Sequence, residues 1–379
     1  MNSIWQRMMF TAPLVLIFCF LSAPRAAGQS TPDPGVQMSQ DVFKNVQLLR
    51  GIPVDEFMDT MGMFAASLGY DCASCHDPNI SSNRALFAVA TPAVQKARQM
   101  IVMMNAINAA NFGGTQRITC FTCHRGQISP EYIPSLALQY AELTEDPNSI
   151  VVSPDRRATP GPVLQKYIQA LGGAQRLANL TSYVARGTYT GFNTGGAQVP
   201  VELYARAPNL RTQVVHMPDG DAVKTFDGRS GWAAEGWRPV PLLPLTGGNL
   251  FGAGLEAMLS FPAALQNAFS QWQTSSTLID DRRMQILQGS NPGQLPVNFY
   301  FDESGLLVRL VRWSKMAVGT IPTQIDYSDY REVAGVKIPF HISVTWTDGQ
   351  NTFELSEVRP NVAIDAGRFA KPAPFQRKQ

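Results

Sequence analysis

Residues 72–76 read CASCH and residues 120–124 read CFTCH, two copies of the pattern Cys-x-x-Cys-His. This spacing is typical of covalent attachment of a c-type haem. Each cysteine adds to one haem vinyl group, and the adjacent histidine becomes the proximal ligand of the iron. We therefore expect two covalently attached c-type haems. The predicted attachment sites and proximal ligands are Cys72, Cys75, Cys120, Cys123, His76 and His124.

A helical pattern precedes each motif, over residues 53–69 and 91–114. Each pattern carries methionines on its apolar face, and methionine sulfur is a common second axial ligand of haem iron. The positions favour Met61 for the first haem and Met100 for the second. The alternatives that stay open are Met58 and Met63 for the first haem, and Met103 and Met104 for the second.

Cys-x-x-Cys pairs also occur in structural zinc sites and in redox-active disulfides. The separation between Cys75 and Cys120 far exceeds that of a zinc ribbon, and a four-thiolate site does not need the two trailing histidines. The strand–helix alternation expected around a redox disulfide is missing. The haem interpretation is therefore preferred.

The start of the chain has the three parts of a secretory signal peptide: a positive first segment, an apolar run over residues 8–23, and small residues before a cleavage site after Gly28. Cys19 falls within the discarded peptide. Because haem is attached to such motifs outside the cytoplasm, we expect an exported, periplasmic protein. Membrane association would need an uncleaved signal segment or a partner.

The composition limits the other possibilities. A net charge of +2 gives no argument for nucleic acid or an anionic membrane as a partner. A chain of 379 residues with 45% hydrophobic side chains can bury two cores. The 27 prolines and 30 glycines indicate a turn-rich chain, which suits an exported β protein joined to a smaller helical module.

The second half of the chain shows short strand patterns separated by turn pairs such as Asp219-Gly220. One helix is expected over residues 163–173, and an apolar, helix-like interruption at 251–269 could cover an open sheet. The fold class is therefore multidomain: a small, mainly α dihaem cytochrome c module followed by an antiparallel, half-barrel-like β-sheet. The expected segments are a signal peptide (1–28), a flexible leader (29–38), a dihaem cytochrome c domain (39–130), a linker (131–160) and an antiparallel β domain (161–375).

Two stretches resemble the cytochrome c subunit of bacterial photosynthetic reaction centres. They are LLRGIPVDEFM at 48–58, continuing through residues 61–70, and ARQM at 97–100, followed by TCFTCHRG at 119–126. The resemblance implies thioether bonds at the four motif cysteines, proximal His76 and His124, and distal Met61 and Met100. That family typically has four haem motifs, and it places a histidine before the second motif, whereas residues 111–119 contain none.

The layout over residues 159–374 resembles the half-open β-barrels of lipoprotein-carrier proteins. Such a sheet has a concave apolar face that can hold an acyl chain or a partner peptide. The β domain is therefore expected to bind a lipid or another hydrophobic ligand.

The leading hypothesis is a periplasmic electron carrier, not an enzyme, that exchanges single electrons with redox partner proteins. The first alternative is a dihaem peroxidase-like enzyme or a haem-based redox sensor, which needs an open iron position. The second is an envelope lipid- or lipoprotein-binding protein that works through the β domain.

Overall fold

The computed structural model describes residues 35–139, 146–155 and 159–378. The predicted signal peptide with Cys19, and residues 29–34 of the predicted leader, lie outside the described residues. Residues Val36–Gln379 form one compact unit. The helical region and the sheet are therefore in contact within that unit.

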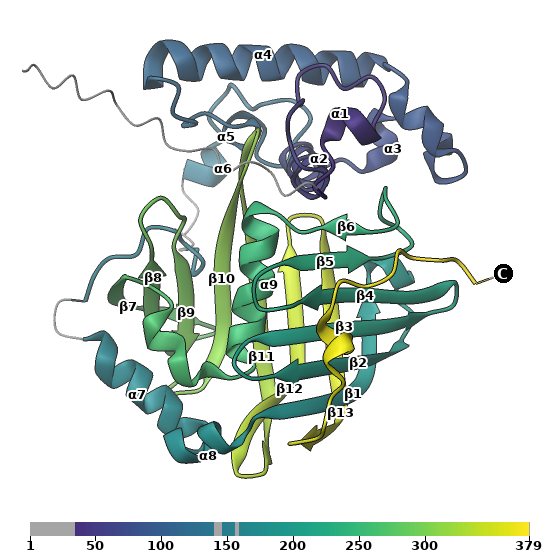
Figure 1. Ribbon diagram of the computed structural model, residues 1–379. Coiled ribbons are helices and arrows are strands. Elements are labelled where there is room, and N and C mark those ends of the chain that lie inside the picture. The colour runs from purple at the N-terminus through teal and green to yellow at the C-terminus, as the bar shows by residue number, and fades with distance from the viewer. Residues whose placement is uncertain (1–34, 140–145, 156–158, 379) are drawn as a thin grey trace, which may run out of the picture. The chain divides into compact units, whose positions relative to one another are not determined.

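Thirteen strands of the described residues form a single sheet in which every neighbouring pair is antiparallel (Figure 1). The order across the sheet is β6-β5-β4-β3-β2-β1-β13-β12-β11-β10-β9-β8-β7. The strands are β1 (Ser182–Gly191), β2 (Val199–Arg206), β3 (Leu210–Met217), β4 (Gly220–Phe226), β5 (Gly231–Ala234), β6 (Leu243–Pro244), β7 (Gln271–Ile279), β8 (Arg282–Ser290), β9 (Val297–Phe301), β10 (Leu307–Met316), β11 (Gly319–Val333), β12 (Val336–Trp346) and β13 (Gly349–Pro360).

The described helices lie mainly before the sheet in the chain. The α-helices are α1 (Ser39–Val42), α2 (Val54–Leu68), α3 (Cys72–Cys75), α4 (Pro92–Phe112), α5 (Cys120–His124), α6 (Leu136–Gln139), α7 (Pro160–Ala170), α8 (Ala174–Asn179) and α9 (Gly247–Leu259). The 3-10 helices are η1 (Pro78–Ser81), η2 (Arg84–Ala88), η3 (Phe192–Thr194), η4 (Pro262–Asn267) and η5 (Ala366–Phe369). The predicted order, a mainly helical module and then an antiparallel sheet, is confirmed.

Local sequence explains these elements. In β2, Val199, Val201, Leu203 and Ala205 alternate with more exposed residues, so one face of the strand enters the core. Helix α4 begins after Thr91, whose side chain accepts a hydrogen bond from the backbone N–H of Val94, and has proline at its first position. The expected helix with a glycine stop over residues 163–173 is α7, and a second short helix, α8, follows the two glycines. The glycines at 172 and 173 separate them because both have positive φ.

The predicted apolar, helix-like interruption at 251–269 corresponds to α9 and η4. Helix α9 bridges two distant parts of the sheet. Lys224 on β4 contacts Glu256 of α9 at 3.1 Å, and Arg312 on β10 donates to the backbone carbonyl of Gly248 at 3.0 Å. Strands β4 and β10 are far apart in the sheet order. The sheet must therefore curve around α9, which lies in front of its strands in Figure 1.

The helical region packs on one end of this sheet. Met63 of α2 and Met104 of α4 are each 4% exposed and join Met316 and Val318, from the β10–β11 hairpin, in one apolar cluster. In Figure 1 that hairpin reaches up to the helices. The two regions therefore share a core.

A buried carboxylate makes the polar part of this interface. Asp55 of α2 is 2% exposed and accepts hydrogen bonds from the backbone N–H and the hydroxyl of Thr246, at 2.6 and 2.7 Å. A third, longer bond of 3.4 Å comes from the Asn249 side chain. These bonds connect the first turn of α2 to the start of α9.

We predict that Asp55→Ala lowers the free energy of unfolding by about 2–3 kcal/mol, because two donors of the half-buried Thr246 lose this buried acceptor. Chemical denaturation followed by far-UV circular dichroism measures this. Asp41→Ala, at an exposed position in α1, should change the same quantity by less than about 0.5 kcal/mol. Equal effects of the two substitutions would contradict the interpretation.

Candidate functional site

Each Cys-x-x-Cys-His motif forms a single helical turn with its own N-terminal cap. Asp71 accepts hydrogen bonds from the backbone N–H and the hydroxyl of Ser74, at 2.8 and 2.6 Å. Before the second motif, Thr119 and Thr122 form a reciprocal capping box. Because residues three apart in a helix share a face, the two cysteines of each motif lie on the same side of their turn.

The four motif cysteines are free thiols. Burial raises the pKa of Cys120 to about 11. It also raises the pKa of Cys72, with a smaller contribution from Asp348, and that of Cys75. All three thiols are therefore protonated at neutral pH. None of the four forms a disulfide, so both pairs remain available for thioether bonds.

The two motif histidines are held in different ways. Nδ1 of His124 lies 3.0 Å from the backbone carbonyl of Gln127. Since a carbonyl can only accept, Nδ1 carries the proton and Nε2 keeps its lone pair. His76 packs edge-on against Phe87 of η2, with ring centroids 4.9 Å apart. Burial lowers the pKa of His76, which favours the neutral ring that binds a metal.

The structure separates the six candidate methionines by their surroundings. The side chains of Met63 and Met104 are buried in the core shared with the β10–β11 hairpin. Met58 lines the cavity of the sheet, and Met103 is 46% exposed. Met61 and Met100 are half-buried, on α2 and α4 respectively.

Hairpin ends of the sheet contact both motif regions. The backbone N–H of Cys120 donates to the carbonyl of Val318, between β10 and β11, at 3.4 Å. The Gln116 side chain donates to the neighbouring carbonyl of Ala317 at 2.9 Å. Asp348, in the β12–β13 turn, lies against Gly62 of α2 and acts electrostatically on Cys72. The sheet therefore supports the haem motifs as well as the core.

The end of α2 also touches the second motif. Gly69 ends the helix in the left-handed conformation, with φ of 66°. A Cβ atom at this position would lie 2.4 Å from the carbonyl oxygen of Gly126. The backbone N–H of Gly126 donates to the carbonyl of Ser67 at 2.9 Å. Only glycine fits this contact.

Sequence reasoning missed Asn108, which holds the segment before the second motif. Its side-chain oxygen accepts from the backbone N–H groups of Arg117 and Ile118, at 3.0 and 2.9 Å. Its side-chain nitrogen donates to the carbonyl of Ile118 at 2.7 Å. The residue is 4% exposed, and a polar residue on the apolar side of α4 was the only signal in the sequence. The caps Asp71 and Thr119 were detectable from their spacing to Ser74 and Thr122.

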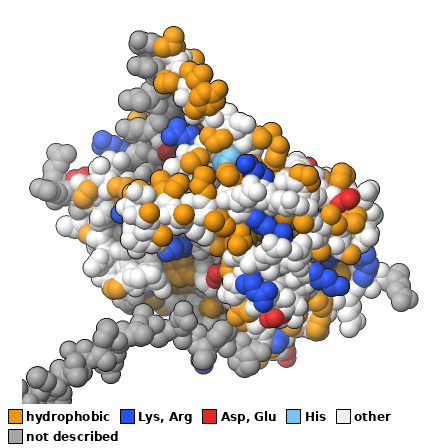
Figure 2. Space-filling model, turned by 90° about the horizontal axis from the view of Figure 1, so that it is seen from above, with side chains coloured by type: hydrophobic (Ala, Val, Ile, Leu, Met, Phe, Trp, Pro, Cys, Tyr) orange, Lys and Arg blue, Asp and Glu red, His pale blue; other side chains and the backbone are white. Residues whose placement is uncertain are grey.

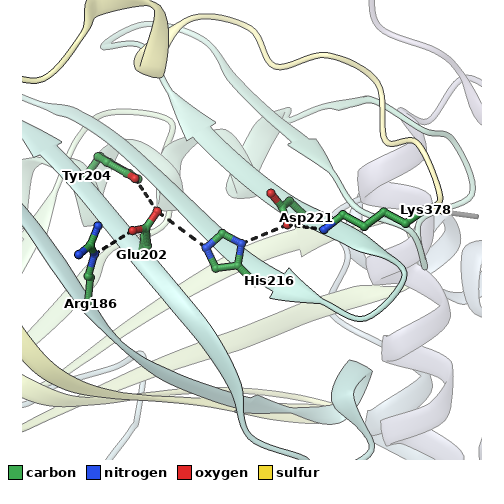
Figure 3. A network of polar contacts seen from close by, with 6 residues as sticks. All are labelled: Arg186, Glu202, Tyr204, His216, Asp221 and Lys378. Carbon is green, nitrogen blue, oxygen red and sulfur yellow. Dashed lines mark hydrogen bonds and ion pairs between the residues drawn. The ribbon is translucent and has the colours of Figure 1, made fainter.

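The other two histidines are paired with acids in the sheet. Figure 3 shows His216 between two carboxylates, with Nδ1 3.1 Å from Asp221 and Nε2 3.8 Å from Glu202. His341 contacts Glu354 at 2.6 Å. Within the described residues, no group of three or more His, Cys, Asp or Glu side chains is arranged to hold a metal ion. The two cysteine pairs thus do not converge on one four-thiolate site.

The helical side of the molecule exposes apolar side chains, which gather in the view of Figure 2. Several of them belong to or flank the haem motifs and α4. They are Phe87, Val102, Met103, Phe112, Phe121 and Ile128, each at least 40% exposed.

The concave side of the sheet contains a cavity of about 510 Å³, within the usual size range of ligand sites. Its wall includes residues of many strands and of α7, α8 and α9. Asp55, Met58, Asp59 and Cys72 of the helical region complete it. The cavity therefore extends from the sheet to the first haem motif.

Two family models match the chain. Residues 21–153 match the photosynthetic reaction centre cytochrome C subunit, and residues 246–358 match a family of unknown function, DUF6544. The cytochrome c subunit of Thermochromatium tepidum is 34% identical over 99 residues, which are 25% of this chain and 23% of that protein. The subunit of Roseobacter denitrificans is 28% identical over 109 residues, 27% of this chain and 29% of that protein.

The predicted resemblance of the N-terminal part to this cytochrome c subunit is confirmed. The chain spans less than a third of the length of the curated relatives that it matches. The similarity thus supports a cytochrome-like role for the helical region. It gives no information about the function of the sheet.

Solved structures similar to the sheet region include a LolA superfamily protein from Nitrosomonas europaea, which is 10% identical. The match covers 56% of this chain and 99% of that one, with a TM-score of 0.38. A putative outer membrane lipoprotein-sorting protein domain from Vibrio parahaemolyticus is 8% identical over 55% of this chain and 95% of that one, with a TM-score of 0.36. Scores this low carry no argument. None of the described helices is long and apolar enough to span a membrane.

We predict that Asn108→Ala lowers the free energy of unfolding by about 2 kcal/mol, because the three hydrogen bonds of this buried side chain are lost. Asn105→Ala is the matched control. It lies on the same helix but is exposed, and its effect should stay within about 0.5 kcal/mol. Thermal unfolding of both variants measures the difference, and a neutral Asn108→Ala would refute the positioning role.

Proposed function

We propose that this protein is an exported c-type dihaem cytochrome that transfers single electrons through two His/Met-ligated haems. The observation that carries the proposal is the arrangement of the second motif. Free thiols share one helical turn, and the backbone fixes the His124 tautomer that leaves Nε2 for iron. The similarity to reaction-centre cytochrome c subunits supports the same conclusion.

The residues fit the group in chemical type. Cys72 and Cys75 would hold one haem, Cys120 and Cys123 the other, with His76 and His124 as proximal ligands. When bound, each haem supplies a one-electron Fe(III)/Fe(II) couple. The protein contributes by holding the haem ligands in place. Both motif regions pack against hairpins of the sheet, which restricts the movement of the motifs.

Met61 and Met100 are proposed as the distal ligands. The deep burial of Met63 and Met104 in the shared core, against which Met61 is only partly buried, supports this choice, as does the exposure of Met103. Met58 remains the competitor of Met61, because it faces the cavity beside Cys72. If methionine fills the sixth coordination position of each haem iron, neither iron has an open position for a substrate or signal molecule. This favours an electron carrier over a peroxidase-like enzyme or a ligand sensor.

The proposed partners are a donor and an acceptor protein that dock on the exposed apolar surface around the motifs. Export to the periplasm, after removal of residues 1–28, is proposed from the signal-peptide pattern and from the site of haem attachment. The segments 39–130, 131–160 and 161–375 are proposed as dihaem domain, linker and β domain.

The cavity favours a second function for the sheet, the binding of a hydrophobic ligand such as a lipid. Apolar residues of the sheet and of α7 and α8 form much of its wall. This role does not depend on the haems, since the wall lies mainly in residues 167–355.

We predict that Met61→Leu and Met100→Leu each lower the potential of one haem, by on the order of 100 mV, because axial ligands set haem potentials over about 0.8 V. Each variant should also bind carbon monoxide at one iron. Leucine keeps the side-chain volume, which limits the loss of stability. Redox titration and the carbon monoxide difference spectrum of the reduced protein are the measurements.

Met63→Leu and Met103→Leu are matched controls on the same two helices, and both should behave as wild type. If Met61→Leu leaves the potentials and carbon monoxide binding unchanged, Met61 is not a ligand, and Met58→Leu becomes the next test. Carbon monoxide binding by the wild type would favour the peroxidase or sensor alternatives.

A further inference from the structure

Three cations lie close to Glu256 inside the cavity. Arg211 of β3, Lys224 of β4 and Arg312 of β10 all line it, as does Glu256 of α9. Lys224 Nζ lies 3.1 Å from Glu256, and Arg211 Nε lies 3.9 Å from the same carboxylate. Asp59 also acts electrostatically on Arg312. This cation cluster (Arg211, Lys224 and Arg312) therefore carries one more positive charge than the two carboxylates that act on it.

Arg312 is the member with unused hydrogen-bonding capacity. It is 8% exposed. One terminal nitrogen donates to the carbonyl of Gly248 at 3.0 Å and to the hydroxyl of Ser314 at 3.1 Å, while its buried Nε has no partner. A Cβ atom on Gly252 would lie 2.5 Å from the Arg312 Cζ. The missing side chain at Gly252 therefore lets the guanidinium lie against α9.

Three other acids of the wall have partners of their own. Asp55 accepts from Thr246, and Asp59 accepts from Asn249 at 2.7 Å. Glu235 pairs with Arg238 at 2.6 Å. The cavity is thus cation-rich beneath α9 and acid-rich where α2 closes it.

Charge interactions are consistent with this picture. Burial acts to raise the pKa of Glu256, but Lys224, Arg211 and Arg312 together lower it. Burial also lowers the pKa of Arg312, against the opposing effect of Glu256 and Asp59. A buried positive charge that is not fully balanced is costly, and a bound anion would relieve that cost.

The part of the cavity next to α7 and α8 is apolar. Its wall includes Leu171, Leu177, Leu180, Leu307, Val336 and Ile338. All six side chains are less than 9% exposed. This lobe suits a hydrocarbon chain rather than a polar solute.

We propose that the cavity binds a single-chain amphiphile with a carboxylate head group, the head at the cation cluster and the chain in the apolar lobe. This inference rests on the proposed ligand-binding role of the sheet and is independent of the haem proposal. Glu256 competes with the ligand carboxylate for the same cations, so removing its charge should strengthen binding.

The test is equilibrium binding of radiolabelled oleate and oleyl alcohol, below micellar concentrations, to the full-length haem-loaded protein. Wild type should bind oleate at least tenfold more tightly than the alcohol. Lys224→Met should weaken oleate binding about ten- to a hundredfold, because a hydrogen bond to a charged group is lost. Glu256→Gln should strengthen it several-fold, and neither substitution should change alcohol binding.

Arg186→Met is the matched control. Arg186 lies on the outer face of the same sheet and pairs with Glu202 (Figure 3), so its loss should leave oleate binding unchanged. Acetate and inorganic phosphate at millimolar concentration should not displace oleate if the chain is required.

Equal binding of oleate and the alcohol would overturn the head-group assignment and leave a purely apolar site. No binding of either would overturn the ligand-binding role of the sheet. Displacement by acetate or phosphate would identify a simple anion site instead. The haem-to-chain ratio and redox titration of the same preparations show separately whether the haem proposal holds.

Discussion

The buried contact between α2 and the start of α9, next to the sheet, is the interaction on which the rest of the structure depends. Asp55 is removed from water and accepts hydrogen bonds from Thr246 and Asn249. One turn further, the same helix carries Asp59, and then Met61 and Met63. Helix α2 therefore contacts the segment next to the sheet, contributes to the shared core and carries the proposed first iron ligand. The positions of these three features relative to one another are set by this one helix.

This arrangement gives the sheet two roles. Its outer hairpins support the haem motifs, through Val318 beneath Cys120 and Asp348 beside Cys72. Its concave side forms a cavity that ends at Cys72. Cys72, one of the thiols proposed to hold the first haem, lines the same cavity as the proposed ligand. The two proposed functions are thus adjacent in the structure, although each can be tested alone.

Much of the helical region could be predicted because its signals are local. Proline, threonine and glycine at the ends of α2 and α4 determine where these helices begin and end, and the haem motifs are contiguous in sequence. The strands with clear alternation, such as β2, were also evident. The glycines at 172 and 173 likewise mark the end of α7, whereas the short helix α8 that follows them was not expected from the sequence.

The cation cluster and the α2–sheet interface could not be predicted. Arg211, Lys224 and Arg312 come from strands that meet only because the sheet curves around α9, and Asp55 finds Thr246 almost two hundred residues later in the chain. Such contacts depend on strand order and register, which alternation alone does not specify. Asn108 is an intermediate case. A polar residue on the apolar side of α4 indicates that its side chain has hydrogen-bond partners, but the sequence does not identify them.

The most direct test of the central claim is the haem content of the mature protein, produced with a cytochrome c maturation system. Mass spectrometry under denaturing conditions should show two covalently bound haems per chain. The reduced protein should give low-spin c-type bands, and the oxidised protein the weak far-red methionine–iron band. A chain without covalent haem, or with high-spin iron at both sites, would contradict the account.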